Sequence, residues 1–473
     1  MTAKKILILL YVSFLIVQII YITNVADPDL DGYVHFVAGR LLSVDAMNLS
    51  THWVWLPLYH YVLVLFIKAG AGFTAVRFFS VLCWMLVVYL TGKLLEQKRI
   101  TGEGKLNNKK VWLTALLFFM PTAFLSASSA EPEAFFTLLI ISGVYLAMQD
   151  KYLLASIPFG AACLVRYEAA AMLAGICIYF ILTVPAFSGK IKQTAEISFL
   201  PILMIFLWLY MRYAYQNEAF SFISRTKQFA DTYTDVRPEY FMQAVQVLFD
   251  ASFYILYIPL LAGGLFLIFA YRGFISAMRK YSLLGFASLS CLLFISLAWW
   301  LRYSLGLYRH FTVLLPFFAL CIKEGVSGCI DRSIPGKSRR KKVVTAVVIT
   351  HILLIIFALG IWEKHTETVM SDSMQIIEKV NALPDNARIL CAENRVEVLS
   401  NKPSSSFERL WIDTSRYSAE KLTNFIETVH NGYFIMNKEM YNFYVFQLWG
   451  KINLIRETGN ADLKKRLVLL QSK

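Results

Sequence analysis

Charge is scarce in this chain of 473 residues: Asp, Glu, Lys and Arg make up only 16% of it, whereas 57% of the residues are hydrophobic and the mean hydropathy is +0.54. A soluble multidomain protein needs more charge than this to cover its surface. The composition therefore predicts an integral membrane protein that lies in a lipid bilayer. The net charge is +14, and the Lys and Arg residues collect in short loops between apolar runs. This distribution is typical of topology signals and not of nucleic-acid binding.

Paired cysteines, a glycine-rich phosphate loop and internal repeats are also missing. The seven cysteines show no CxxC spacing and most lie inside apolar runs, which excludes a disulfide framework or a structural zinc site. A nucleotide-binding fingerprint is missing as well. The lack of repeats counts against many transporter folds.

A dense acidic segment follows the first apolar run, 4–24. Asp27, Asp29 and Asp31 fall within five residues, at the start of a polar loop, 25–52, that we expect to carry a short interfacial helix. A carboxylate beside the bilayer can act as a general base toward a hydroxyl. Asp31 is the favoured base because a helix N-terminus would stabilise its charged form, and Asp29 is second. The alternative is a solvated, turn-forming loop.

Eleven membrane spans are predicted from the apolar runs. Run 53–69 is interpreted as an interfacial or re-entrant helix, because a span there would place the basic loop 96–110 on the same side as the acidic segment. With that choice every basic loop falls on the N-terminal side, which we take as cytoplasmic. The predicted spans are 4–24, 73–95, 111–127, 132–149, 152–165, 168–187, 194–216, 250–270, 282–300, 309–322 and 343–362.

The C-terminal part has the composition of a soluble domain. Segments 387–392 and 432–437 are predicted as buried strands, and 419–430 and 440–452 as amphipathic helices. We therefore expect a membrane domain over 1–362 and a small extracytoplasmic α/β domain over 363–473.

Two glutamates begin a later apolar run on the predicted outer side. Glu131 and Glu133 flank a proline, an arrangement that also suits an ordinary helix start. In a functional role either carboxylate would bind acceptor, donor sugar or a divalent ion. No cofactor is required, but a set of carboxylates would favour Mg or Mn over zinc.

Cations are the other candidates for substrate binding. Arg166 and Glu168 interrupt an apolar stretch, where charges are costly and face protein or a cavity, so they either pair with each other or bind substrate. Arg302 and Arg309 border a turn and would either hold a lipid phosphate or snorkel to headgroups. Asp27 and three histidines complete the candidate substrate-binding set: His35, His60 and His310.

With these residues in view, the chain resembles the GT-C superfamily of polyprenyl-phosphate-sugar-dependent glycosyltransferases. It looks most like the branch of protein O-mannosyltransferases and lipid A aminoarabinose transferases. The matching pieces cover about 1–330 and, in outline, the C-terminal domain: DPDLDGYVHFVAGRLL, WLPLYHYVLVLF, FTAVRFFSVL, SSAEPEAFFTLL, LVRYEA and YRHFTVLLP.

The resemblance implies a sugar donor on polyprenyl or dolichyl phosphate, a hydroxyl acceptor, an acidic base in the first loop, and inversion at the anomeric carbon. By position, Asp31 would be the base, Glu133 the second acidic residue and Arg309 a contact of the donor phosphate. Many relatives have Asp-Glu where this chain has Asp31-Gly32, which leaves the choice between Asp29 and Asp31 open. Leu301 follows two tryptophans where oligosaccharyltransferases carry Trp-Trp-Asp, which argues against transfer of a whole oligosaccharide.

Two other functions compete with the glycosyltransferase. A transporter or lipid flippase would place ionisable residues deep within several spans. A membrane scaffold would not concentrate acids and arginines at one membrane face, as the predicted topology does here. The N-terminus is expected in the cytoplasm, in a bacterial or archaeal cell membrane rather than the endoplasmic reticulum.

Overall fold

The structure, a computed structural model, has two compact units, which are described separately. Unit 1 comprises Met1–Val25 and Ala38–Gly360, and unit 2 comprises Ala26–Val37 and Ile361–Lys473. The predicted boundary at 362/363 lies outside the described residues. The described residues are 3–27, 29–97, 103–217, 219–233, 264–304, 308–333, 373–391, 393–409, 432–437, 452–457 and 467–472.

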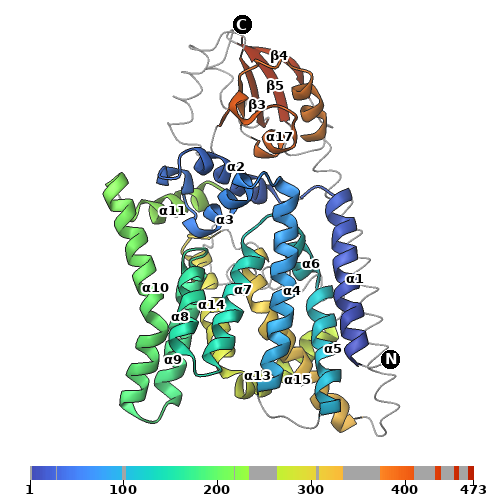
Figure 1. Cartoon of the computed structure of the whole chain (residues 1–473), viewed down its shortest axis with the longest axis vertical. Coiled ribbons are helices and arrows are strands. Elements are labelled where there is room, and N and C mark those ends of the chain that lie inside the picture. Colours follow the sequence, from blue (N-terminus) through green and yellow to red (C-terminus); the bar gives the residue numbers. More distant parts are fainter. Residues whose placement is uncertain are drawn as a thin grey trace. The chain divides into compact units, whose positions relative to one another are not determined.

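Unit 1 is built from apolar helices, and the axes of its long helices lie roughly parallel to one another while the chain runs along them in opposite directions (Figure 1). Among the described residues, four helices are long and apolar enough to cross a membrane. Their exposed faces are apolar, as on α1, where Ile8, Leu9 and Ile20 are each more than half exposed. This surface suits lipid, and the protein is an integral membrane protein. The four helices are α1 (Ala3–Asn24), α4 (Phe73–Gln97), α10 (Phe187–Gln216) and α14 (Ser282–Trp300).

Another predicted span, 111–127, is broken in the structure. α5 (Glu103–Phe119) and α6 (Pro121–Ser128) meet at a bend of 66° and pass as one span only if the bent pair is counted together. Proline lacks the N–H that continues a helix but suits its first turn, and Pro121 stands at the start of α6. The predicted span 111–127 is therefore a bent pair of helices in the structure.

Several other predicted spans are shorter than the roughly 20 residues that cross a bilayer. The segment predicted as interfacial or re-entrant, 53–69, contains the 12-residue helix α3. The span at 343–362 and much of that at 250–270 lie outside the described residues, so the number of eleven stays a prediction. The remaining helices of unit 1 are α3 (Pro57–Lys68), α7 (Glu133–Ala147), α8 (Tyr152–Cys163), α9 (Glu168–Thr183), α11 (Ser221–Tyr233), α13 (Gly264–Lys280) and α15 (Leu315–Ser333).

Close helix crossings hold unit 1 together. α8 packs on α10, α9 on α14 and α13 on α15. At Gly273 of α13, an added Cβ would lie 1.9 Å from the main-chain oxygen of Cys321 on α15. Small residues allow such close approach of backbones in membrane helices.

Unit 2 contains a five-stranded mixed sheet in the order β2-β1-β3-β5-β4. β1 is parallel to β2 and β3, whereas β5 is antiparallel to β3 and β4. Two of these strands, β1 and β3, fall in the segments predicted as strands, while the predicted helices 419–430 and 440–452 lie outside the described residues, apart from residue 452, which begins β4. The strands are β1 (Ile389–Cys391), β2 (Phe407–Arg409), β3 (Tyr433–Asn437), β4 (Ile452–Glu457) and β5 (Leu467–Ser472).

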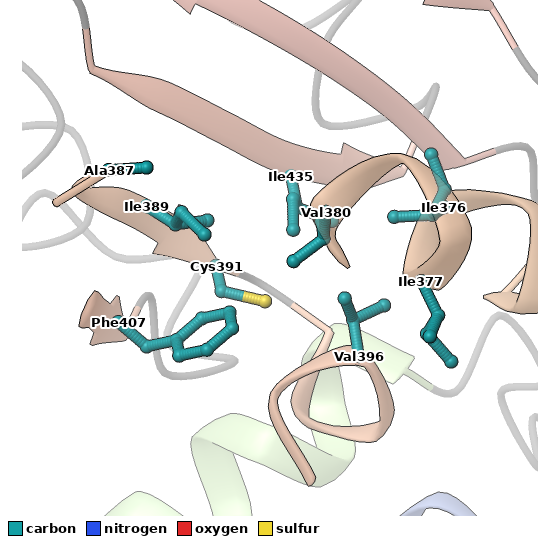
Figure 2. Packing of buried hydrophobic residues seen from close by; sticks show 9 residues of the cluster. All are labelled: Ile376, Ile377, Val380, Ala387, Ile389, Cys391, Val396, Phe407 and Ile435. Atoms are coloured by element: carbon teal, nitrogen blue, oxygen red, sulfur yellow. The ribbon is translucent and has the colours of Figure 1, made fainter. Parts of the chain in front are cut away.

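The core of unit 2 lies between the sheet and two helical segments. Residues 373–381 are helical, and the short helix α17 (Asn394–Leu399) follows β1. Figure 2 shows Ile376, Val380 and Val396 from these helices around Cys391 and Ile435 of the strands, all of them buried. Apolar burial of this kind is what stabilises a small α/β unit.

Candidate functional site

The acidic segment begins α2 (Leu30–Val44) and its first two carboxylates bind the backbone. Asp27 Oδ1 accepts the N–H of Asp29 at 3.2 Å, and Asp29 Oδ1 accepts the N–H of Asp31 at 3.1 Å. Asp29 therefore acts as the N-cap of α2, a position where Asp is strongly preferred. Asp27 is fully buried, whereas Asp29 and Asp31 are half-buried. Asp31 lies in the first turn of α2, as predicted.

A buried ion network in unit 1 is centred on Arg166, in the turn between α8 and α9. Its Nη1 donates to Glu133 Oε1 at 2.5 Å, while its Nη2 and Nε donate to the two carboxylate oxygens of Glu168 at 2.9 and 3.3 Å. Glu133 and Glu168 are the first residues of α7 and α9, where helix N-termini favour negative charge. One arginine thus joins the ends of two helices.

The network continues through η2 (Tyr308–Leu314). Arg309 forms an ion pair with Glu131, and its Nε lies 4.0 Å from Glu133 Oε1. His310 Nδ1 lies 3.3 Å from Glu168 Oε1. The structure therefore brings six predicted site residues from three stretches of sequence into one group: Glu131, Glu133, Arg166, Glu168, Arg309 and His310.

Burial and charge define what this group can do. Burial lowers the pKa of Arg166, but the carboxylates of Glu168 and Glu133 raise it more, so the net pKa lies above the ordinary value. Both arginines are thus neutralised by protein carboxylates. Glu133 Oε2 is buried and has no hydrogen-bond partner among the described residues. It can accept a hydrogen bond from a substrate hydroxyl.

His60 lies against His52 in a stacked pair. The two Nδ1 atoms are 2.8 Å apart and the rings are inclined by 13°. One Nδ1 must donate and the other accept, so both rings cannot be protonated at once. Burial, the neighbouring His60 and Arg212 together lower the pKa of His52 to about 2. His52 is therefore neutral at neutral pH.

Two further candidates lie elsewhere. His35 is buried in α2. Arg302 lies in the turn after α14 with a φ of 60°, a left-handed conformation that is uncommon for a residue with a side chain. Within the described part of the chain, no group of three or more His, Cys, Asp and Glu residues is arranged to hold a metal ion. Binding of Mg or Mn by such a group therefore stays a prediction.

Arg77 is a structural residue whose role the sequence did not reveal. It is 3% exposed, and its guanidinium donates to the carbonyl oxygens of Ser128 at 2.6 Å, Val25 at 2.7 Å and Ile22 at 3.2 Å. These carbonyls end α6 and α1, where a helix dipole attracts cations. The signal in the sequence is an arginine four residues into an apolar span; its partners could not be read from it.

Comparison with known proteins shows similarity in structure alone. No protein-family model and no curated protein sequence matches the chain. ArnT from Cupriavidus metallidurans bound to undecaprenyl phosphate superposes with a TM-score of 0.64 at 11% identity, covering 97% of both chains. The archaeal oligosaccharyltransferase AglB from Archaeoglobus fulgidus, in complex with an inhibitory peptide and a dolichol-phosphate, gives a TM-score of 0.55 at 10% identity, covering 94% of this chain and 71% of that one.

ArnT is an aminoarabinose transferase, and both neighbours are members of the GT-C superfamily. The superposition with ArnT covers 97% of this chain, so the similarity is not limited to a few helices. At 10 to 11% identity the agreement is one of fold. The chain therefore shares its fold with ArnT and AglB, in agreement with the resemblance in sequence motifs.

Proposed function

We propose that this protein is an inverting glycosyltransferase that moves a monosaccharide from a polyprenyl-phosphate or dolichyl-phosphate donor to a hydroxyl acceptor on a lipid, glycan or protein. The observation that carries the proposal is the fold, shared over 97% of both chains with ArnT, which was solved with undecaprenyl phosphate bound. The acidic segment and the ion network supply the chemistry.

Asp31 is proposed as the general base. Its carboxylate takes the proton of the acceptor hydroxyl as the oxygen attacks the anomeric carbon. The bond between that carbon and the phosphate oxygen breaks on the opposite face, and the lipid phosphate leaves with the electron pair, which inverts the configuration. Asp29 already caps α2 through its Oδ1 and so has a structural task that supports the first turn, where Asp31 lies.

The ion network is proposed to bind polar parts of the substrates. Glu133 Oε2 would accept a hydrogen bond from a sugar hydroxyl, and Arg166 fixes that carboxylate through its other oxygen. Arg309 is proposed to contact the donor phosphate, in exchange for part of its ion pair with Glu131. If a divalent ion takes part, it would be Mg or Mn, bound by carboxylates, and would stabilise charge on the phosphate.

The proposed orientation follows from the charged loops. The N-terminus would lie in the cytoplasm and the C-terminal domain outside it, because Lys and Arg collect in loops on the N-terminal side. A transporter is the less favoured function, since the proteins that share this fold here are transferases.

The test is transfer of label from a panel of radiolabelled polyprenyl-phosphate monosaccharides into membrane extracts by the purified protein. Asp31→Asn is expected to lower transfer by about 100-fold or more while donor binding persists. Asp29→Asn should have a smaller effect, because Asn is as good an N-cap as Asp. Asp45→Asn, which alters an exposed aspartate beyond α2, is the matched control and should leave transfer unchanged.

Each alternative outcome has a definite meaning. A larger loss in Asp29→Asn than in Asp31→Asn would make Asp29 the base. Transfer at the wild-type rate by both variants would show that the acidic segment is not the reaction centre. If the wild type consumes no donor of the panel, the glycosyltransferase proposal fails and transport of a lipid becomes the next function to test.

A further inference from the structure

The short helix α17 carries a buried cation, Arg395, that is not part of the apolar core of unit 2. Val396 of this helix packs among the apolar side chains of unit 2, as Figure 2 shows. Successive residues of a helix point about 100° apart, so Arg395 faces a different direction from Val396. Arg395 is nevertheless only 6% exposed. Its Nε lies 3.9 Å from Oε1 of the neighbouring Glu393.

Part of the burial of this side chain comes from the acidic segment. The Arg395 guanidinium lies over the ring of Tyr33, 5.7 Å from its centroid, and Nη1 is 3.5 Å from Ser373 Oγ. Tyr33 is fully buried and stands two residues after Asp31 in α2. A cation within about 6 Å of an aromatic face is attracted to it, most strongly when both are removed from water.

The two stretches of chain that form unit 2 are consistent with this contact. Residues Ala26–Val37, which include all three aspartates, belong to the same compact unit as Ile361–Lys473, although more than 300 residues of sequence separate them. The C-terminal residues and the start of α2 therefore pack together as one unit.

We propose that Arg395 is a positioning residue: through the ring of Tyr33 it fixes the first turn of α2, and the C-terminal domain thereby sets the geometry of the proposed base. This proposal rests on the proposed function for its effect on catalysis. A general base works only within hydrogen-bond reach of its proton, and a displacement of about 1 Å can cost about 100-fold in rate. Loss of the contact should therefore lower kcat more than it changes KM.

The experiment uses the full-length protein with substitutions on both sides of the contact. Arg395→Met and Tyr33→Leu remove the cation and the ring, whereas Arg395→Lys and Tyr33→Phe keep them. We expect a fall in kcat of about 10- to 100-fold for the first two, KM within about 2-fold, and recovery of most activity in the conservative pair. The double variant Arg395→Met with Tyr33→Leu should be no slower than the worse single variant.

A matched control lies in the same domain. Arg388 precedes β1, and its side chain is 55% exposed and paired with Glu408. Arg388→Met removes an arginine of unit 2 that does not lie over Tyr33, and it should leave kcat unchanged. An equal loss of activity in Arg388→Met would assign the effect to general weakening of the domain and overturn the proposal.

Hydrogen exchange separates this proposal from the proposed function. Amides of residues 29–37 should exchange faster in Arg395→Met and in Tyr33→Leu than in wild type, and at the wild-type rate in Arg388→Met. Unchanged exchange in the first two overturns the positioning role whether or not the protein transfers sugar. Faster exchange with no transfer by wild type would leave Arg395 as a positioning residue of α2 and overturn the proposed function alone. If Arg395→Met does not fold, Tyr33→Leu against Tyr33→Phe decides in the same way.

Discussion

Glu131 and Arg309 are 178 residues apart in the chain, yet their side chains form a buried ion pair. The pair ties the start of α7 to η2 and adjoins the group around Arg166. A buried pair is costly to break, because the remaining partner is left as an uncompensated charge away from water. The residues proposed to bind substrate therefore also hold together the ends of several helices.

The coupling between these two residues can be measured by a double-mutant cycle. Glu131→Gln and Arg309→Gln should each lower the free energy of unfolding by about 3 to 5 kcal/mol, and the double variant by clearly less than the sum. The measurement is denaturant unfolding of the purified protein in detergent. The exposed pair Lys192 and Glu196, 3.9 Å apart on α10, is the control and should show a coupling below about 0.5 kcal/mol. Additive losses at Glu131 and Arg309 would contradict the buried pair.

Arg166 should be replaceable by no other residue. Arg166→Met leaves Glu133 and Glu168 buried without their shared cation, and we expect a loss of about 3 to 5 kcal/mol in the free energy of unfolding. Lysine has no planar fork to bind two carboxylates, so Arg166→Lys should recover only part of that loss. Thermal unfolding in detergent would compare the three proteins. Full recovery by lysine would show that charge alone, and not the double contact, stabilises this turn.

His52 should make the folded protein less stable in acid. Its pKa is lowered to about 2 in the folded state, against about 6.5 when unfolded, so between these values the unfolded chain binds more protons. Stability is fully present above about pH 6.5 and is lost as the pH falls, by about 1.4 kcal/mol per pH unit. Unfolding measured between pH 7.5 and 5 should show this slope in wild type and a shallower one in His52→Gln. Equal slopes would show that His52 does not titrate in this way.

Arg77 should act as a clamp between two helix ends. Arg77→Met leaves three carbonyl oxygens of α1 and α6 without their donor, and we expect a loss of at least about 2 kcal/mol in the free energy of unfolding. Arg77→Lys cannot reach all three oxygens and should recover little. Lys93→Met on the same helix, α4, removes an ion pair with Glu96 in which both side chains are 33% exposed, and it should cost less than about 1 kcal/mol. Similar losses in Arg77→Met and Lys93→Met would argue against the clamp.

Local patterns in the sequence were sufficient where one stretch of chain decides its own structure. The runs 4–24, 73–95 and 282–300 became α1, α4 and α14, because an apolar run of this length satisfies its backbone as a helix in lipid. Asp31 was placed in the first turn of a helix by the same kind of local argument, and Asp29 caps it. The bend at Pro121 was not predicted, because an average of hydropathy over a window does not register the missing N–H of one residue.

The sequence by itself thus determined that this is a helical membrane protein with an acidic segment after its first span, and it named the residues of the ion network. Only the tertiary structure decided the distant partners: Arg166 pairs with Glu133, 33 residues away in the chain, and Arg395 lies over the ring of Tyr33. Propensity and periodicity act over a few residues, whereas these contacts join stretches that meet only after the helices and the sheet have packed. The partner of a buried charge is set by that packing, because the low dielectric of the interior penalises any charge left alone.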